Sequence, residues 1–202
     1  MPENRNHGQG SIKKSGNNKA NPITTLKDVR DIISILKGEP RNSLLFVIGV
    51  NSWLRIGTLL ILKVGDVRRL EIGDKHFFYE PDSQNPKYLE INRSIYNELK
   101  KYLKDTTLKD GDHLFKSRKG KDHLTIQSVN RLVTRWTKTI GLNGYYGCES
   151  LRKTFGYIQR IEFGVGFDIL CKRFNQQSPA KMATFLGIPK EKPVTILNNK
   201  VG

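Results

Sequence analysis

Apolar residues recur at helical spacing along most of the chain. Residues 24–39 give the clearest example, and they predict a helix that Thr24 or Thr25 caps and Gly38 ends. The apolar face of this helix consists of Leu26, Val29, Ile32, Ile33 and Leu36. Residues 41–53 are apolar nearly all round, which is typical of a helix packed inside a core.

Further helices are predicted on both sides of a central interruption. One covers residues 55–67, and its inward-facing residues are Leu59, Leu60 and Leu62. Helical periodicity returns in residues 93–103, 125–142, 149–163 and 167–175. The last predicted helix has Ser178 as N-cap, Pro179 at its first position and Gly187 at its end.

The interruption covers residues 67–92, where apolar and polar residues alternate and aromatic and β-branched residues are frequent. Turn signals at residues 73–74 and 82–86 divide it into three short strands. These strands predict a small three-stranded antiparallel sheet inserted among the helices. The predicted fold class is therefore α+β and mainly helical.

The length of the chain, 202 residues, suits one domain with tails. We expect this domain over residues 23–188. Residues 1–22 contain mostly Gly, Asn and Lys with little to bury, so they are predicted to be a disordered basic tail. Residues 189–202 are expected to form a C-terminal tail.

Charge points to a polyanionic partner. The chain has 35 Lys and Arg against 19 Asp and Glu, a formal net charge of +16. Lysine and arginine gain affinity for nucleic acids by releasing counterions from phosphates. The alternative interpretation of the positive charge is that it only keeps the protein soluble. No run reaches the ~18 apolar residues of a membrane span. The N-terminus also lacks a secretory pattern, so the expected location is the cytoplasm.

Cysteine and histidine spacing suggests no metal site. Cys148 and Cys171 are predicted to be free thiols in a reducing compartment, and the four histidines are scattered. No metal and no other cofactor is expected.

Three ordered segments carry a resemblance. Residues 51–67 (NSWLRIGTLLILKVGDV), 149–157 (ESLRKTFGY) and 174–188 (FNQQSPAKMATFLGI) resemble the signature boxes of the tyrosine recombinase catalytic domain, and the match extends over about residues 24–188. The resemblance implies a domain that clamps duplex DNA. Active members cut and rejoin DNA through a covalent phosphotyrosine, without metal, ATP or a small-molecule substrate.

Only two of the six positions that the resemblance implies for catalysis hold the family's residue. Arg55 and Arg152 match the two arginines that bind the scissile phosphate. The departures are Asp82 in place of lysine, Glu149 in place of histidine, Gln176 in place of histidine and Phe185 in place of the nucleophilic tyrosine. Lys75 or Lys87 remains an alternative source of the hairpin lysine.

These departures predict a pocket in which carboxylates cancel the positive charge of the two arginines. Carboxylates at Asp82 and Glu149 would pair with the two arginines and compete with phosphate for the same N–H groups. For Glu149 the alternative is a negative charge that favours the helix dipole. Phe185 is expected to fill the space of a phenol as a core aromatic residue.

Basic residues outside this pocket are candidates for DNA contacts. They are Lys116, Arg118, Lys119, Lys121, Arg131, Arg135, Lys138 and Lys153. Three of them lie along one face of the helix predicted over residues 125–142, where a solvated helix face is the alternative interpretation.

The favoured hypothesis is a catalytically inactive, recombinase-like DNA-binding protein. It would be a remnant of a mobile element or a modulator of an active relative, with duplex DNA, an active recombinase or its own copies as partners. In a bacterium this places it at the nucleoid. One alternative is an active recombinase whose tyrosine is displaced, at Tyr145, Tyr146 or Tyr157, or is supplied by a partner. The other is a protein-interaction module that has lost DNA binding.

Overall fold

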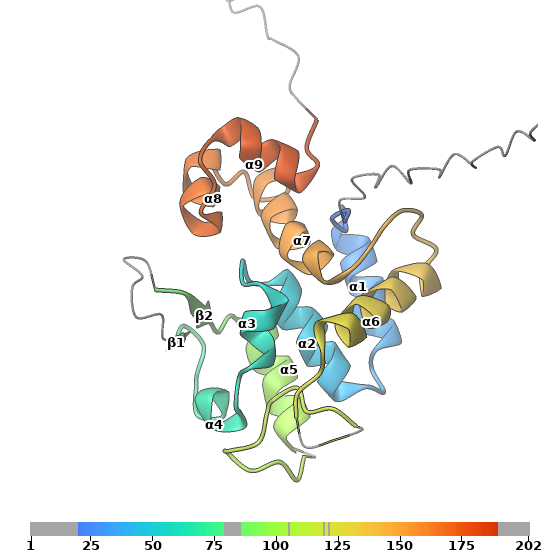
Figure 1. Cartoon of the computed structure of the whole chain (residues 1–202), viewed down its shortest axis with the longest axis vertical. Helices are drawn as coiled ribbons and strands as arrows, with labels where there is room; N and C mark the ends of the chain where they lie inside the picture. The colour runs from blue at the N-terminus through green and yellow to red at the C-terminus, as the bar shows by residue number, and fades with distance from the viewer. Residues whose placement is uncertain (1–19, 79–85, 105, 119, 121, 190–202) are drawn as a thin grey trace, which may run out of the picture.

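The computed structural model describes residues 20–78, 86–104, 106–118, 120 and 122–189 (Figure 1). Its elements are α1 (Leu26–Ile35), α2 (Pro40–Val50), α3 (Ile56–Leu60), α4 (Val64–Val67), β1 (Lys75–Phe77), β2 (Tyr88–Glu90), α5 (Arg93–Lys104), α6 (Ile126–Thr139), α7 (Cys148–Ile161), α8 (Phe167–Phe174) and α9 (Pro179–Leu186). The chain is mostly helical with a small antiparallel sheet, which confirms the predicted α+β class.

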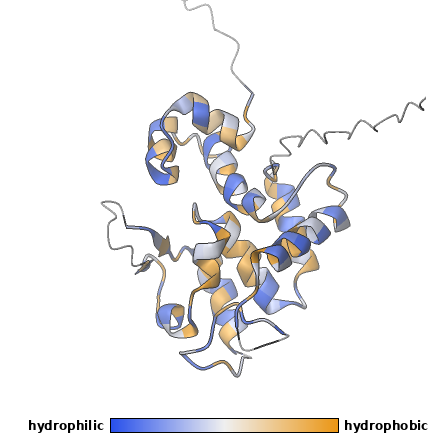
Figure 2. Cartoon of the chain, in the orientation of Figure 1, coloured by the Kyte–Doolittle hydropathy of each residue, from blue (hydrophilic) through white to orange (hydrophobic). Residues whose placement is uncertain are grey.

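Helix α2 is the centre of the main core. Every residue from Asn42 to Val50 is buried, as expected for a helix that is apolar all round, and α2 packs against α5 and α7. Figure 2 shows hydrophobic residues gathered where these central helices meet. A Cβ atom added at Gly49 would lie 3.0 Å from Leu151 Cβ, so glycine lets α2 and α7 approach closely. No described helix is long and apolar enough to cross a membrane.

The predicted caps of the first and last helices are confirmed. Thr25 caps α1 by accepting a hydrogen bond from Asp28 N. Ser178 caps α9 by accepting one from Lys181 N, and Pro179 follows at the first helical position. Gly187 ends α9 in the left-handed region, with φ of 74°.

The helix predicted over residues 55–67 is divided in the structure into α3 and α4. Backbone groups at the break pair with a distant loop instead of continuing the helix, since Leu114 N donates to Leu62 O (2.8 Å) and Val64 N donates to Asp112 O (3.0 Å). Leu59, Leu60 and Leu62 are nevertheless buried, as predicted. Periodicity therefore gave the buried face correctly but could not show the competing backbone partners.

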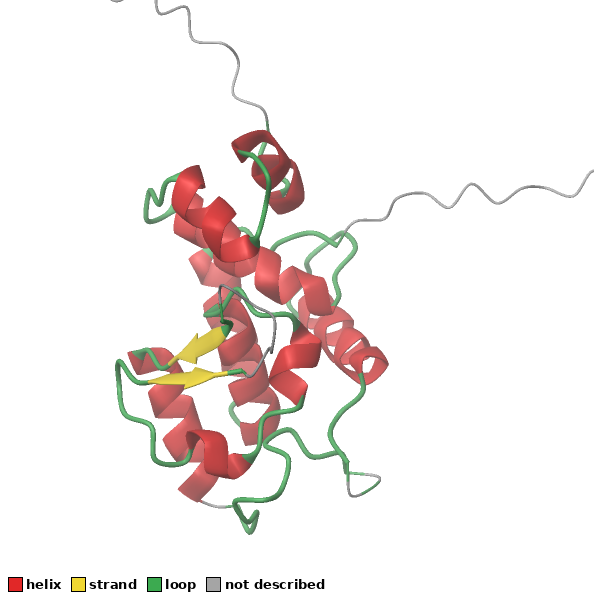
Figure 3. Ribbon diagram, turned by 60° about the vertical axis from the view of Figure 1, so that its left-hand side comes forward, coloured by secondary structure: helices red, strands yellow, loops and turns green. Residues whose placement is uncertain are grey.

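The described part of the sheet has two strands, so the prediction of three was wrong in that detail (Figure 3). Strands β1 and β2 pair antiparallel, with His76 opposite Leu89. The segment from residue 68 to 74 forms turns, in which Asp74 N donates to Glu71 O (3.1 Å) and the Asp74 carboxylate accepts from Glu71 N. An aspartate that hydrogen-bonds its own turn favours a turn over a strand.

Helices α8 and α9 form a second, smaller core against α7 (Figure 1). Its buried residues are Leu170, Cys171, Phe174, Met182 and Leu186. The N-terminal segment is anchored at the middle of α7, since Ile23 is fully buried and its N–H donates to Thr154 Oγ1. Residues 20–22, assigned to the tail in the sequence-based division, lie within the described part of the chain.

Candidate functional site

Arg152, in the second turn of α7, is a buried cation at the junction of three segments. Its exposed fraction is 9%. Nε donates to Trp53 O (2.6 Å) and Nη2 to Phe174 O (3.3 Å), so the guanidinium joins the loop before α3 to the end of α8. Nη1 lies 3.2 Å from Glu149 Oε1, one turn earlier on α7. Arg152 and Glu149 are therefore paired, as the sequence predicted.

Arg55 is the N-cap residue of α3 and is exposed. It lies two residues after Trp53, whose carbonyl binds Arg152. Burial lowers the pKa of Arg152, the carboxylate of Glu149 opposes that shift, and the like charge of Arg55 adds to it. The structure thus brings the two motif arginines near each other. Within the described residues, no hydrogen bond or ion pair engages the Arg55 side chain, whereas the Arg152 guanidinium is held on three sides.

Two aromatic rings enclose the Arg152 guanidinium. Its Cζ atom lies 4.8 Å from the centroid of the Phe174 ring and 5.3 Å from that of Phe185. The two rings meet edge to face at 5.8 Å, and Lys153 Nζ lies 5.1 Å from the Phe185 centroid. Phe185 therefore brings α9 to the arginine through cation–π contacts and presents no hydrogen-bonding group there.

The other predicted site positions are less closely tied to Arg152. Gln176 lies in the loop between α8 and α9, where its backbone N–H donates to Cys171 O (2.9 Å), and its side chain makes no hydrogen bond to a described residue. Asp82 lies outside the described residues, so its predicted pairing with the arginines stays a prediction.

Within the described part of the chain, none of the three tyrosines considered as displaced nucleophiles makes a hydrogen bond or cation–π contact with Arg152. Tyr145 and Tyr146 precede α7, and Tyr145 is 56% exposed. Tyr157 follows Arg152 by five residues on α7, which turns its side chain about 140° around the helix axis.

A cluster of alternating cations and aromatic rings beside the arginine pair was missed from the sequence. Arg173 Cζ lies 4.8 Å from the Trp53 ring and 5.1 Å from the Tyr88 ring, and Arg173 also donates to the Tyr88 hydroxyl. Lys75 Nζ lies 4.9 Å from Tyr88 on the same hairpin. The cluster ties α8 to β2 and to the loop before α3. Its members come from three segments that are far apart in sequence, so the sequence did not show that they meet. Only Trp53 lay within a predicted site segment, in the sequence NSWLR.

Comparison with known proteins gives the family. No family model matches the sequence. The chain is 30% identical over 175 residues to the probable integrase/recombinase YoeC of Bacillus subtilis (strain 168), over 84% of this chain and 91% of that protein. The chain belongs to the tyrosine recombinase family.

Solved recombinase structures share the fold. The XerA recombinase superposes with a TM-score of 0.66 at 16% identity, over 84% of this chain and 62% of its own. The XerH site-specific recombinase bound to difH substrate gives 0.64 at 19%, over 83% and 49%. A lambda integrase dimer bound to a COC′ core site gives 0.61 at 14%, over 94% and 52%. The chain thus spans about half to three-fifths of these recombinases.

In this family member, α6 presents its cations to solvent. Arg131, Arg135 and Lys138 are all exposed, although Arg135 Nη2 lies 3.7 Å from Glu39 Oε1. Lys153 is different: it is 5% exposed and its ammonium donates to Ala20 O (2.7 Å). Lys153 is therefore buried and bound to the N-terminal segment, and its predicted DNA contact stays a prediction.

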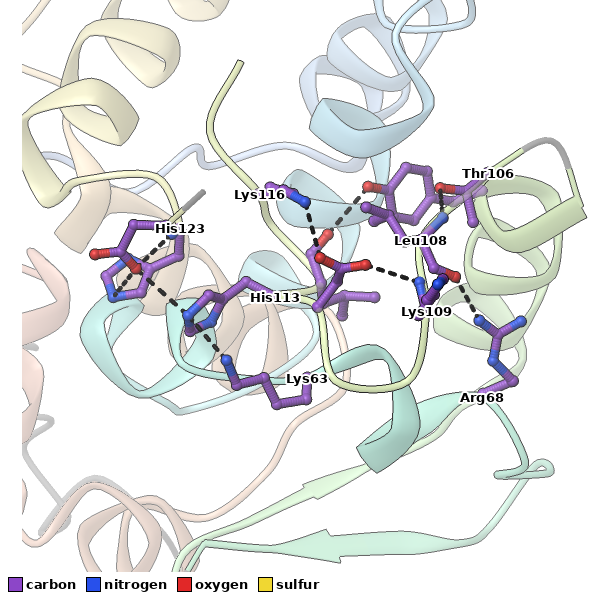
Figure 4. Close-up of polar contacts among 12 residues, drawn as sticks. Lys63, Arg68, Thr106, Leu108, Lys109, His113, Lys116 and His123 are labelled. Carbon is purple, nitrogen blue, oxygen red and sulfur yellow. Dashed lines mark hydrogen bonds and ion pairs between the residues drawn. The ribbon is translucent and has the colours of Figure 1, made fainter. Parts of the chain in front are cut away.

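The basic turn at residues 115–123 belongs to a loop that its own side chains stabilise (Figure 4). Lys116 Nζ pairs with Asp112 (2.8 Å), and Lys63 Nζ lies 2.9 Å from His113 Nε2. Arg118 is exposed. Lys119 and Lys121 lie outside the described residues.

Proposed function

We propose that this recombinase-family chain binds duplex DNA and does not cleave it. The observation that carries the proposal is the Phe185 ring against the Arg152 guanidinium, with centroid and Cζ 5.3 Å apart. If Phe185 occupies the position of the family's nucleophile, the group facing the phosphate-binding arginine is a phenyl ring. Strand cleavage through a phosphotyrosine requires an oxygen at that point, and phenylalanine has none.

The contacts of Arg152 support the same conclusion. A guanidinium has five N–H donors, and three nitrogens of Arg152 already bind Glu149 and two backbone carbonyls. A phosphate would have to compete with the Glu149 carboxylate, which accepts from the guanidinium just as a phosphate oxygen does. Arg152 is therefore suited to holding the loop before α3 and the end of α8 together, and less suited to stabilising a transition state.

DNA binding is supported by charge and by the relatives. The net charge of +16 favours a polyanion, and α6 exposes three cations on one face. Solved relatives include XerH bound to difH substrate and the Tn1549 transposon integrase in complex with circular intermediate DNA. A DNA-binding member without cleavage would act as a modulator of an active recombinase, or persist as a remnant of a mobile element, with that recombinase or its own copies as partners.

The test is covalent adduct formation on a nicked suicide duplex, resolved by denaturing gel, beside a mobility shift on the same duplex. The unaltered chain should shift the duplex and form no adduct. An adduct that disappears in Tyr157→Phe would show a displaced nucleophile and contradict the proposal.

Restoring the phenol separates the two defects of the site. Phe185→Tyr alone should form little adduct, because Arg152 stays engaged and general acid–base groups, each worth about 10² to 10⁴ in rate, are missing. The combination Asp82→Lys, Glu149→His, Gln176→His and Phe185→Tyr should form more. Equal adduct from the single and the combined variant would mean that only the nucleophile had been lost.

A further inference from the structure

A second cationic site lies at the opposite end of α2 from the arginine pair. It is a pocket of about 330 Å³ where the start of α2 meets the end of α5 and the loop after it. Arg41 and Asn42 line it from α2, Tyr102 from α5, and Lys116 and Arg118 from the basic turn. Figure 4 shows Thr106, Leu108 and Lys116 on this side of the loop.

The Arg41 guanidinium is held in a fixed position at this pocket. Nη1 donates to Lys116 O (2.7 Å), while Nε and Nη2 donate to Asn42 Oδ1 (3.2 and 3.0 Å). Burial lowers the pKa of Arg41, and the like charge of Arg118 adds to that shift. Arg118 lines the same pocket as Arg41, so an anion bound there would offset the repulsion between two like charges.

The remaining charges around the pocket are already paired. Lys116 Nζ binds Asp112 at 2.8 Å. The Glu39 carboxylate accepts from the side-chain amide of Asn42 and lies 3.7 Å from Arg135 Nη2. Its negative charge also opposes the lowering of the Arg41 pKa. Arg41 and Arg118 therefore supply the net positive charge of the pocket.

Backbone donors add to this charge. Helix α2 has 11 residues and begins with Pro40, which has no N–H, and the Glu39 side chain makes no cap. Within the described residues, the N–H groups of Arg41 and Asn42 have no acceptor. Free backbone amides in the first turn of a helix attract anions. Here the residues that carry them, Arg41 and Asn42, line the same pocket as Arg118.

We propose that this pocket binds a phosphate group of the DNA backbone, at a point remote from Arg55 and Arg152. The proposal rests on the DNA-binding function proposed above. Helix α2, which is about 16 Å long, separates the two sites.

Helix α6 runs from the neighbourhood of Arg55, near the end of α2, toward the pocket at the start of α2. Its first residue, Ile126, lies beside Gly57 of α3, next to Arg55, with 3.9 Å between Ile126 Cδ1 and a Cβ atom built at Gly57. Arg135, further along α6, lies 3.7 Å from Glu39 at the pocket. The exposed cations of α6 therefore lie between the two sites, where one DNA backbone could contact them together with both sites.

The first test asks whether the pocket binds phosphate at all. The full chain is titrated with inorganic phosphate while amide and arginine Nε resonances are recorded by NMR. The Arg41 and Asn42 amides and Arg41 Nε should shift in a saturable way. Arg118→Gln should weaken the apparent affinity about tenfold through loss of a charge-assisted hydrogen bond, whereas Arg30→Gln, an exposed α1 arginine with the same charge loss, should leave it nearly unchanged. Resonances that do not move, or equal effects of both variants, would overturn the site.

The second test identifies the source of the phosphate. Duplex affinity is measured by fluorescence anisotropy over a range of salt concentrations. Arg118→Gln should reduce the slope of log K against log salt by about one. An unchanged slope, with phosphate still bound in the first test, would assign the pocket to free phosphate or nucleotide and overturn the DNA part of the proposal. If the unaltered chain binds no duplex, the proposed function fails, and the phosphate titration still decides the pocket.

Discussion

Arg152 is bound by two backbone carbonyls as well as by a carboxylate, so removing it affects stability. Its guanidinium bonds Trp53 O and Phe174 O from segments that are far apart in sequence. A buried carbonyl that loses its donor costs about 1–3 kcal/mol. Arg152 therefore acts as a structural cation that links the main core to the smaller core of α8 and α9.

We predict that Arg152→Gln lowers the free energy of unfolding by about 2–4 kcal/mol, because two carbonyls lose their donors. Arg55→Gln should change it by less than about 0.5 kcal/mol, since Arg55 is exposed. Urea unfolding followed by circular dichroism measures both. Equal effects of the two substitutions would mean that the carbonyl contacts contribute little.

Part of this site was predictable from residue types alone. A carboxylate at Glu149 predicted pairing with a motif arginine, with a helix-dipole charge as the alternative, and the 3.2 Å contact with Arg152 shows the pairing. The carbonyl partners were not predictable, because every residue carries a carbonyl and only the fold selects Trp53 and Phe174. The same holds for the pocket at Arg41, which depends on a bond to a carbonyl 75 residues away.

At the scale of helices, periodicity and caps predicted most of the observed elements. They failed where backbone groups found partners in another segment, as at the break between α3 and α4. Two glycines inside helices illustrate the same limit. A Cβ atom at Gly49 would lie 2.7 Å from Leu151 Cδ1, whereas one at Gly57 would find its nearest neighbour at 3.9 Å. The apolar stretch around Gly49 predicted a buried helix, but it could not show that Leu151 lies against this glycine.

Gly49→Ala is therefore expected to destabilise the chain and Gly57→Ala is not. Overpacking costs about 1–3 kcal/mol, which exceeds the gain of up to about 1 kcal/mol from helix propensity. Gly57→Ala keeps the propensity gain alone. Thermal unfolding should place the midpoint of Gly49→Ala below that of the unaltered chain and that of Gly57→Ala at or above it. The reverse order would contradict the close contact of α2 with α7.

The loop after α5 should make stability depend on pH. Burial lowers the pKa of His113, and the nearby charges of Lys63 and His123 add to the shift, while Asp122 and Asp112 oppose it. Below the ordinary histidine pKa of about 6.5, the unfolded chain binds a proton that the folded chain binds only at lower pH. Acid in this range therefore favours unfolding.

We predict that the free energy of unfolding falls between pH 7 and pH 5, and that His113→Gln flattens this dependence. Glutamine can still accept from Lys63 but does not titrate. Urea titrations of both proteins at the two pH values measure the difference. The same slope in both would show that another group is responsible.

At the scale of the molecule, positive charge is spread over α6, the basic turn and the start of α2. Phosphate contacts of this kind position a protein on DNA without reading sequence. Affinity should therefore be similar for unrelated duplexes and should fall steeply with salt.

Replacing Arg131, Arg135 and Lys138 with Gln should reduce the salt slope by about 0.9 for each phosphate contact that is lost. Replacing Lys100, Lys101 and Lys104 of α5 removes the same charge, and two of these lysines are already paired with Glu71 and Glu98. Anisotropy titrations at several salt concentrations should show a larger change for the α6 variant. Equal slopes in the two variants would indicate that overall charge, and not a face of α6, binds the duplex.

The position of Trp53 makes the candidate site observable by fluorescence. The chain contains two tryptophans, and Trp136 is buried against Phe46 with an indole N–H that has no acceptor among the described residues. In Trp136→Phe, all indole emission would come from Trp53, which stacks on Arg173 and bonds Arg152 through its carbonyl. The emission wavelength would then report directly whether α8 is docked, and a DNA strand displacing Arg173 would be visible without any attached dye.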